Sequence, residues 1–502
     1  MPICGRILSE KSKPFTLIIG DSKKKKFLMI RGVRMLRNKF SKSFYALFFT
    51  EFWERFSYYG MQAILLFYMY FSVSEGGLGF SETTAVSIVS IYGALVYLLG
   101  VLGGYVSDRF LGSYKSVLFG GVLIMFGHVF LSLLDGLSGL FLGLLLIVLG
   151  SGLLKPNIPK MVGELYERQD HLRDSAFSLY YFGVNLGAFI APLLTGWFGL
   201  KYNFHYGFGL AAIGMFIGLI TFYFIGSYKD NKAPDRNTEF KCTKIVYMFF
   251  AFGFILVLMS YFNCLNIDNI ILVISLIIMV LPIYLFYSIL SSKKLTKKEY
   301  SSVLYYIPLF IAAVIFWEIE ELSNVIFLMF ANTNVELYWV PVSWIASINP
   351  LFILLLTPIF VYLWLKLGNK QPSTSKKFFY SLIFAGIGLL VMLIPLLSEG
   401  LNVKISVVWL LLSYFLVVVA ELLISPIGLS ATYKSAPGLF KSRLMALWNI
   451  SDSVGQAINS QIVKYFIGNE IMFFMVLGLI PIIFAVIFYV FIPKIDSTRL
   501  KN

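Results

Sequence analysis

Charge is scarce in this sequence. Lysine, arginine, aspartate and glutamate together make up 13% of the 502 residues, which is about half of the fraction that soluble domains usually carry. Hydrophobic residues make up 58% of the chain and aromatic residues 17%. A chain this apolar does not form a soluble globular domain, so we expect an integral membrane protein.

Cysteine and histidine are also rare. The three cysteines form no CxxC pair and the three histidines are scattered, so neither a disulfide framework nor a zinc site is expected. The sequence contains no HExxH, GxSxG or GxxxxGK[ST] motif, the commonest signatures of zinc proteases, serine hydrolases and nucleotide-driven pumps. We therefore expect neither an enzyme nor a bound metal or organic cofactor.

Long apolar stretches fill most of the chain. Each is near the ~20 residues that a helix needs to cross a ~30 Å hydrocarbon core. The stretches are continuous, whereas the strands of a membrane β-barrel alternate in polarity over about ten residues. We expect an all-α membrane protein with fourteen transmembrane helices, near residues 44–71, 84–107, 114–134, 138–162, 175–198, 207–227, 244–263, 268–291, 303–331, 345–366, 378–397, 405–433, 441–466 and 470–493.

The spacing of these stretches indicates a six, two, six organisation. Two six-helix bundles with a segment between them are typical of transporters whose halves are related by pseudosymmetry, with a site at mid-membrane depth. The added pair of helices has no membrane-embedded charge, so we expect a lipid-facing hairpin. The expected divisions are a basic tail (1–43), an N-terminal bundle (44–227), a linker with two helices (228–302), a C-terminal bundle (303–493) and a short tail (494–502).

The distribution of basic residues predicts the topology. The net charge is +15, and the lysines gather in the amino-terminal tail and in alternate loops such as SSKKLTKKEY and KLGNKQPSTSKK. The intervening loops, such as SVSEGGLGFSE and ANTNVELYWVPVS, have no lysine or arginine. By the positive-inside rule we expect both termini to lie on the cytoplasmic side. The expected localisation is the cell membrane. The basic tail then acts near anionic lipid, and no nucleic-acid partner is expected.

Charged residues inside the apolar stretches are the strongest functional signal. Each costs about 2.5–3.5 kcal/mol at the centre of a membrane helix, so each needs a partner, a water-filled cavity or a function. Glu51, Glu54 and Arg55 are spaced i, i+3, i+4, which places them on one helix face. The other embedded charges are Lys155, Glu318, Glu320, Glu321, Glu421 and Asp452. Both halves contribute, which favours a shared polar cavity over the alternative of buried ion pairs that only fix helix packing.

Such a cavity suits a small zwitterion. Lys155 offers a place for an anion and Glu421 a place for a cation. Buried carboxylates take up protons more readily than exposed ones, so we expect coupling to a proton gradient. Walls and hydrogen bonds are expected from Tyr58, Tyr59, Tyr97, Tyr180, Asn185, Asn349 and Trp448.

Several motifs resemble one transporter family. The stretch EFWERFSYYG, residues 51–60, resembles the E-x-x-E-R-F-x-Y-Y-G motif of the proton-dependent oligopeptide transporter family, within the major facilitator superfamily. The other matching motifs follow in the family's order between residues 44 and 493: GGYVSDRFLGSYK with Asp108 and Arg109, GLLKPN with Lys155, FSLYYFGVNLGAF, FWEIEELS with Glu320 and Glu321, SINPLF with Asn349, and ELLISPIGLSATYKSAP with Glu421. The loop motif with Asp108 and Arg109 alone would indicate only the superfamily, whereas this ordered set of motifs is specific for the oligopeptide transporter family.

The resemblance implies proton-coupled uptake of di- and tripeptides by alternating access, in a bacterial-type chain that we expect to function as a monomer. It assigns proton coupling to Glu51, Glu54, Arg55, Lys155 and Glu320. It assigns peptide binding to Tyr58, Tyr59, Gln62, Tyr97, Lys155, Asn185, Glu321, Asn349, Glu421, Trp448 and Asp452. It also implies a cytoplasmic gate in which Lys155 pairs with Glu421, and a charged loop at Asp108 and Arg109. The alternative is a transporter of another small anion or zwitterion, such as nitrate, on the same fold.

Four positions depart from the family pattern. Gln62 stands where many members have an arginine that pairs with the glutamate corresponding to Glu321, so this ion pair cannot form and carboxylate binding falls more heavily on Lys155 and Arg55. Asn449, Asp452 and Glu318 are the other departures. One interpretation of Asp452 and Glu318 is that they face water or pair locally. The other is that they make the pocket more acidic and change its preference for peptide side chains or its proton stoichiometry.

Overall fold

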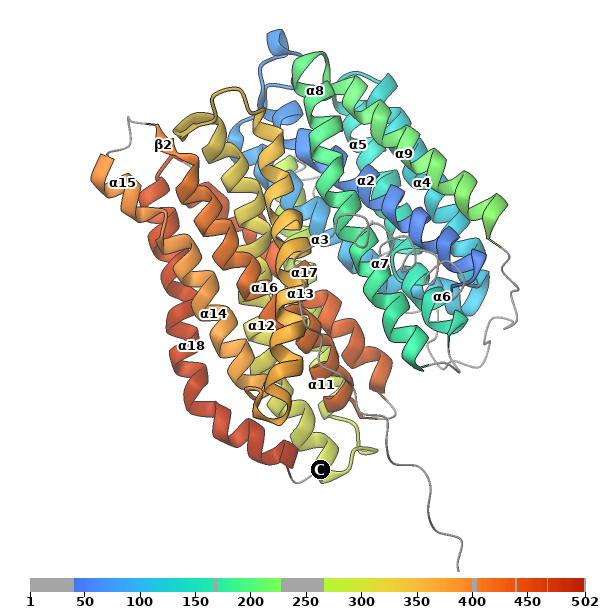
Figure 1. The fold of residues 1–502 in the computed structure, drawn as a ribbon, viewed down its shortest axis with the longest axis vertical. Coiled ribbons are helices and arrows are strands. Elements are labelled where there is room, and N and C mark those ends of the chain that lie inside the picture. The colour runs from blue at the N-terminus through green and yellow to red at the C-terminus, as the bar shows by residue number, and fades with distance from the viewer. Residues whose placement is uncertain are drawn as a thin grey trace, which may run out of the picture. The chain divides into compact units, whose positions relative to one another are not determined.

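The computed structural model describes residues 40–166, 170–226, 266–399, 404–437, 440–466 and 468–500 (Figure 1). Residues Lys42–Asn502 form one unit, and Met1–Ser41 form a second, of which only the last two residues are described. The helix expected near 244–263 lies outside the described residues. All of the described helices and strands belong to the unit that begins at Lys42.

The N-terminal half is a bundle of long helices, coloured blue to green in Figure 1. Helix α2 packs against α7 and α9, α4 packs against α5 and α9, and α3 packs against α5. Its elements are α2 (Lys42–Tyr70), η1 (Val73–Glu75), α3 (Glu82–Val106), η2 (Ser107–Leu111), α4 (Ser113–Leu133), α5 (Gly136–Leu154), α6 (Asn157–Leu165), α7 (Asp170–Ala191), η3 (Pro192–Gly196), α8 (Trp197–Lys201) and α9 (Phe204–Ile225).

The C-terminal half is built around α12, which packs against α14, α16, α17 and α18. Two short parallel strands pair Val335 with Ile405 and Glu336 with Ser406. The added helix α11 (Ile267–Leu290) precedes this half. The elements of the half are α12 (Lys297–Asn334), β1 (Val335–Glu336), η4 (Val342–Ser347), α13 (Ile348–Leu367), η5 (Gly368–Lys370), α14 (Thr374–Leu390), α15 (Leu393–Glu399), β2 (Ile405–Ser406), α16 (Val407–Ser435), α17 (Lys441–Ile462), η7 (Val463–Tyr465) and α18 (Glu470–Leu500).

The expected all-helical membrane architecture is confirmed for the described ranges. Eleven helices there are long and apolar enough to cross a membrane. Helices α2 and α17, with 29 and 22 residues, are also long enough but carry embedded charged and polar side chains. The span expected at 138–162 is interrupted between α5 and α6, because Pro156 has no amide hydrogen to continue the helix.

Helix α11 has one lipid-facing side. Leu276, Ile283 and Tyr287 are exposed on it, whereas Ser275 and Ile278 are buried where the helix packs against α17 and α3. Ser275 is hydrogen-bonded to Ser460 of α17 at 2.8 Å. The added helix that the structure describes therefore contacts both halves while exposing an apolar face.

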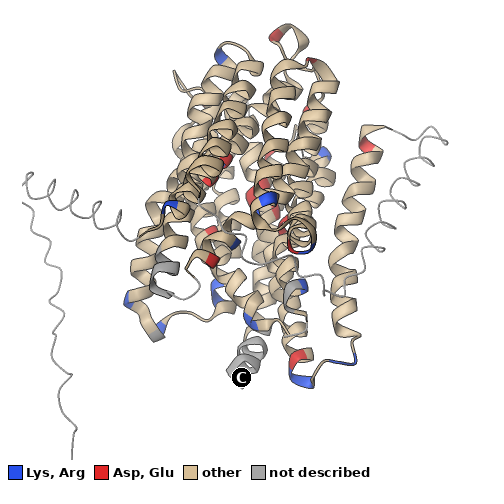
Figure 2. Ribbon diagram, turned by 90° about the vertical axis from the view of Figure 1, so that its right-hand side faces the viewer, with Lys and Arg blue, Asp and Glu red and all other residues tan. Residues whose placement is uncertain are grey.

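The two ends of the bundle differ in charge. We call the end with the 292–296 and 368–373 connections the basic end, because Lys293, Lys294 and Lys370 lie there, and the opposite end, with η4, the outer end. Lysine and arginine gather near the lower end of the bundle in Figure 2, the end that carries the C-terminus.

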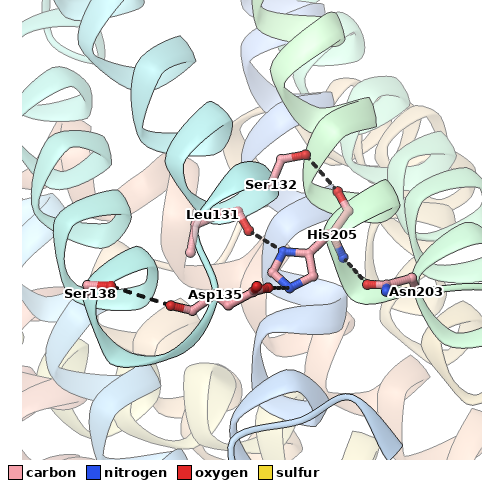
Figure 3. A network of polar contacts seen from close by, with 6 residues as sticks. All are labelled: Leu131, Ser132, Asp135, Ser138, Asn203 and His205. Carbon is pink, nitrogen blue, oxygen red and sulfur yellow. Dashed lines mark hydrogen bonds and ion pairs between the residues drawn. The ribbon is translucent and has the colours of Figure 1, made fainter.

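A polar network fastens the outer end of the N-terminal half (Figure 3). The His205 ring contacts the Leu131 carbonyl through Nδ1 at 2.9 Å and the Asp135 carboxylate through Nε2 at 3.0 Å. Ser132 donates a hydrogen bond to the His205 carbonyl at 2.9 Å, and the Asn203 side chain caps α9. The turn between α4 and α5 is thereby joined to the start of α9.

Candidate functional site

The three charges of α2 form one compact group. Arg55 Nε donates to Glu51 Oε1 at 2.9 Å and lies 2.8 Å from Glu54 Oε2. All three residues are buried. Gly187 of α7 lets the two helices approach closely here, since a β-carbon at that position would lie 2.5 Å from the Phe52 carbonyl oxygen. The i, i+3, i+4 spacing thus produces a carboxylate pair with a single shared cation.

Lys155 lies at the break between α5 and α6, close to this group. Its Nζ atom is buried and makes no hydrogen bond. It lies 4.2 Å from the centre of the Tyr58 ring and 4.7 Å from the centre of the Tyr97 ring. Aromatic faces attract cations, more strongly when water is excluded. Two tyrosines from α2 and α3 therefore hold the ammonium group of Lys155 in place of a carboxylate partner.

The carboxylates of the C-terminal half have amide partners instead. Glu320 Oε1 accepts hydrogen bonds from Asn324 at 2.8 Å and from Asn349 at 3.1 Å. Asn349 also lies within hydrogen-bonding reach of Glu421, whose Oε2 atom is buried without a partner. Glu320, Glu421 and Glu321 are close enough to interact electrostatically. The amide of Asn349 thus links α12, α13 and α16.

A cavity of about 170 Å³ lies between the two halves. Among the described residues its wall contains three carboxylates and no lysine or arginine. Eight of the residues expected to bind substrate line it: Tyr58, Tyr59, Gln62, Tyr97, Asn185, Glu321, Asn349 and Glu421. The cavity is therefore acidic on the side of the C-terminal half and aromatic on the side of the N-terminal half.

Three expected substrate residues do not line this cavity in the structure. Lys155 is covered by the Tyr58 and Tyr97 rings. Trp448 lies against Trp317, with ring centres 6.5 Å apart, and so packs behind a wall residue. Asp452 accepts a hydrogen bond from Gln456 of its own helix at 2.6 Å. Each lies one layer behind the wall.

Glu318 and Asp452 differ in their surroundings. Glu318 is buried but does not line the cavity, and its backbone carbonyl accepts a hydrogen bond from Asn459 of α17. Asp452 interacts electrostatically with Lys155 and Glu320. This geometry favours local pairing for Asp452, which is also the nearer of the two to the charged groups around the cavity.

The two halves are joined at the outer end. Trp344 Nε1 donates to the Leu193 carbonyl at 3.2 Å, and Ser347 Oγ donates to the Phe189 carbonyl at 2.8 Å. Asn332 of α12 donates to the Tyr70 hydroxyl of α2 at 3.1 Å. In addition α3 packs along α17 and α7 along α13.

The charge pairs expected toward the basic end are arranged differently from the prediction. Among the described residues Lys155 and Glu421 form no ion pair with each other. Asp108 pairs with Lys160 of α6 at 2.6 Å, and Arg109 donates to the Tyr105 hydroxyl at 2.9 Å. Both of these contacts lie within the N-terminal half, so a gating role across the halves stays a prediction.

Some wall residues are not predicted from the sequence. Asn324 follows Glu320 by four residues on α12, so helical spacing alone could have identified it. Tyr181 is adjacent to Tyr180 in the FSLYYFGVN stretch, and only the structure distinguishes which of the two faces the cavity. Trp317 also lines the wall; it lies in the FWEIEELS motif, but the motif predicted a role only for its glutamates.

Comparisons with known proteins agree on one family. The model of the POT family matches residues 114–476. The "Uncharacterized transporter YclF" of Bacillus subtilis is 41% identical, with 90% of this chain and 94% of the relative covered. The "Di-/tripeptide transporter" of Lactococcus lactis subsp. cremoris is 43% identical, with 90% and 96% covered.

A solved structure agrees with the sequence relatives. The crystal structure of a peptide transporter POT in complex with sulfate matches with a TM-score of 0.85 at 42% identity, covering 91% of this chain and 95% of that one. The relatives that carry a functional name are transporters rather than enzymes. This chain is a multi-pass membrane protein that belongs to the POT family.

Proposed function

We propose that this chain takes up di- and tripeptides together with protons across the cell membrane by alternating access. The proposal includes fourteen transmembrane helices arranged six, two, six, with both termini in the cytoplasm and a monomer as the working unit. The helices on either side of residues 227–265 and the basic loops at one end support this arrangement. The name of the relative at 43% identity, a di-/tripeptide transporter, supports transport of small peptides.

The distribution of charge around the cavity is the observation that carries the proposal. Glu321 and Glu421 line the side of the C-terminal half, where they offer acceptors for a peptide's terminal ammonium group. Lys155 and Arg55 lie behind the tyrosines of the N-terminal half, where they attract its carboxylate. Opposite charges on opposite halves suit a short zwitterion, whose binding draws the two halves together.

Proton coupling is proposed to involve Glu51, Glu54, Arg55, Lys155 and Glu320. The first three share one buried ion-pair group, and Lys155 interacts electrostatically with Glu54. Glu320 accepts its hydrogen bonds from the neutral amides of two asparagines. A buried carboxylate without a cation is neutralised by a proton, so occupation of Glu320 by a proton is the natural partner of peptide binding.

We also infer that the structure corresponds to an inward-facing state. The halves make hydrogen bonds at the outer end through Trp344 and Ser347. Toward the basic end the proposed gate pair of Lys155 and Glu421 is not formed. With the basic end in the cytoplasm, a closed outer end and an unpaired inner gate describe a transporter that is ready to release its substrate inside.

The alternative of nitrate transport fits the cavity less well. A wall with three carboxylates and no lysine or arginine repels a small anion. Uptake of labelled dialanine into proteoliposomes with an imposed inward proton gradient tests the choice, with trialanine, nitrate and free alanine as comparisons. Dialanine and trialanine are expected to accumulate, and a protonophore should abolish accumulation. Accumulation of nitrate without dialanine would overturn the peptide proposal.

A further inference from the structure

An apolar groove of about 430 Å³ lies at the outer end, away from the peptide cavity. The loop after β1 forms one side of it, and the starts of α13 and α16 form another. The third side comes from the N-terminal half, through Phe189 and Leu193. The groove thus lies where the two halves meet.

The groove lies near one end of the apolar helices α13 and α16. Leu351 and Leu411, on its floor, lie about one turn, roughly 5 Å, into α13 and α16. Trp339 and Tyr338 at its rim are 80% and 88% exposed. Tryptophan and tyrosine are enriched at membrane interfaces because one end of each ring system is apolar and the other is polar. Largely exposed aromatic rings beside an apolar lining fit an acyl chain entering from the bilayer.

One charged residue lines the groove, and a second of opposite sign lies close to it along the paired strand. Glu336 lines the groove, and Tyr338 donates a hydrogen bond to its carboxylate at 3.0 Å. Lys404 is exposed and lies two residues before Ser406, the strand partner of Glu336. Ser406 caps the N-terminus of α16, which favours negative charge. The rim therefore offers an acceptor for an ammonium group close to a site for a phosphate.

The backbone of the rim is held in an unusual conformation. Tyr338 has a φ of 49°. In the described part of the chain no other non-glycine residue has a positive φ. The left-handed region is unfavourable for a bulky residue, because its β-carbon lies too close to the following carbonyl oxygen. The hydrogen bond to Glu336 fixes the carboxylate beside the groove, so this conformation presents the charge and the aromatic rings on one rim.

We propose that this groove binds one phospholipid with an ethanolamine headgroup. Its primary ammonium group donates to Glu336, its phosphate lies near Lys404 and the N-terminus of α16, and one acyl chain lies along Leu351 and Leu411. A primary ammonium has three hydrogens for the carboxylate, whereas the quaternary ammonium of a choline headgroup has none. An anionic headgroup without an amine leaves Glu336 unpaired.

The lipid would also favour one conformation of the protein. The groove includes residues from both halves, and the inter-half hydrogen bonds from Trp344 and Ser347 end at Leu193 and Phe189, which line it. Opening of the outer end separates these sides. This consequence rests on the proposed alternating-access function, because a ligand shifts an equilibrium only when it binds one state better than the other.

Native mass spectrometry tests the binding. The purified full chain is titrated with an equal mixture of phosphatidylethanolamine and phosphatidylcholine that have the same acyl chains. The wild type is expected to retain the first phosphatidylethanolamine about fivefold better than phosphatidylcholine, as for an exposed ion pair. Glu336→Gln should lose this preference, and Glu75→Gln, which removes a carboxylate elsewhere at the outer end, should retain it. Equal retention of the two lipids by the wild type, or an unchanged preference in Glu336→Gln, would overturn the proposal.

The aromatic rim has its own control. Trp339→Ala should weaken retention of both lipids, whereas Tyr206→Ala, which removes an exposed ring at the outer end of α9, should not. If the wild type instead forms a dimer that Trp339→Ala dissociates, a second copy of the chain occupies the groove and the lipid proposal fails.

Hydrogen exchange of residues 335–347 tests the effect on conformation. In detergent with phosphatidylethanolamine at twice its Kd, binding only to the closed state slows exchange about threefold. Glu336→Gln should show no such slowing. If slowing occurs in a chain that transports no dialanine, the lipid site stands and the proposed function fails. If dialanine is transported but exchange is unchanged by the lipid, the proposed coupling of this groove to the outer gate is wrong.

Discussion

The two halves of the molecule neutralise their buried carboxylates in different ways. In α2, Arg55 contacts both Glu51 and Glu54. In the C-terminal half, Glu320 is bonded to neutral amides, and the cavity wall has no basic residue. A carboxylate inside a membrane needs a cation or a proton. The N-terminal half supplies the cation from its own sequence, whereas we propose that the C-terminal half receives a proton from solvent or the ammonium group of a peptide.

Removing the cation of α2 should have the largest effect. Arg55→Met leaves two buried carboxylates without their ion-pair partner, and we expect the free energy of unfolding to fall by about 3–5 kcal/mol. Unfolding by a denaturing detergent, followed by circular dichroism, measures this loss. Arg55→Lys keeps the charge and should lose less. A wild-type unfolding midpoint in Arg55→Met would show that the carboxylates of α2 do not depend on this cation.

Neutralising Glu320 in the C-terminal half should leave the free energy of unfolding almost unchanged and should abolish proton-driven accumulation of peptide. In Glu320→Gln the side-chain oxygen still accepts from Asn324 and Asn349, so we expect the free energy of unfolding to change by less than about 1 kcal/mol. One proton moving down about 100 mV provides some 2.3 kcal/mol, enough for roughly fifty-fold accumulation of a neutral solute. Accumulation of dialanine in proteoliposomes should fall to equilibration, while counterflow exchange remains.

Glu51→Gln is the corresponding variant in the N-terminal half and is measured in the same transport assays. Loss of driven accumulation with retained exchange in both variants would place proton transfer in both halves. Normal accumulation by Glu320→Gln would remove that residue from the coupling group and leave the role to α2 alone.

Contacts within a single helix could be predicted from the sequence. The group in α2 lies within one helix, so its i, i+3, i+4 spacing was enough to predict the contacts of Arg55. The bond between Glu320 and Asn324 has the same i, i+4 spacing and could have been predicted too. Continuous apolar runs likewise predicted the helices of the described ranges, and a proline explains the interruption after Lys155.

Side-chain contacts between different helices could not be predicted from the sequence. The rings around Lys155 come from α2 and α3, whose relative rotation depends on packing along their whole lengths. Whether Trp448 lines the cavity or lies behind Trp317 depends on the same kind of packing. The predicted pair of Lys155 with Glu421 is not formed in this structure, and in the proposed alternating-access cycle it would form in a different conformation, which the sequence alone does not distinguish.

The tyrosines around Lys155 should make a smaller contribution. Tyr97→Leu removes one of the two rings, and we expect the free energy of unfolding to fall by about 1 kcal/mol beyond the loss of packing. Tyr97→Phe keeps the ring and is the matched control. When Lys155→Met has already removed the cation, Tyr97→Leu should lower the free energy of unfolding by about 1 kcal/mol less than it does in the wild type. A double-mutant cycle measures this difference. Equal costs in the two backgrounds would show that the ring acts only by packing.

Placing a cation in the acidic cavity should have the smallest effect. Gln62 lines the wall that lacks basic residues, so Gln62→Arg adds a partner for Glu321 or for the peptide carboxylate. Because the position is half-buried, the gain is limited to about 1 kcal/mol, or two- to fivefold in affinity. Competition of dialanine and its carboxyl amide for labelled peptide uptake measures this, with Gln62→Met as the control. A higher preference for the free carboxylate only in Gln62→Arg locates the peptide's carboxyl end beside α2. An unchanged ratio means that the added guanidinium pairs with Glu321 instead, which would give the C-terminal half the internal cation that it otherwise lacks.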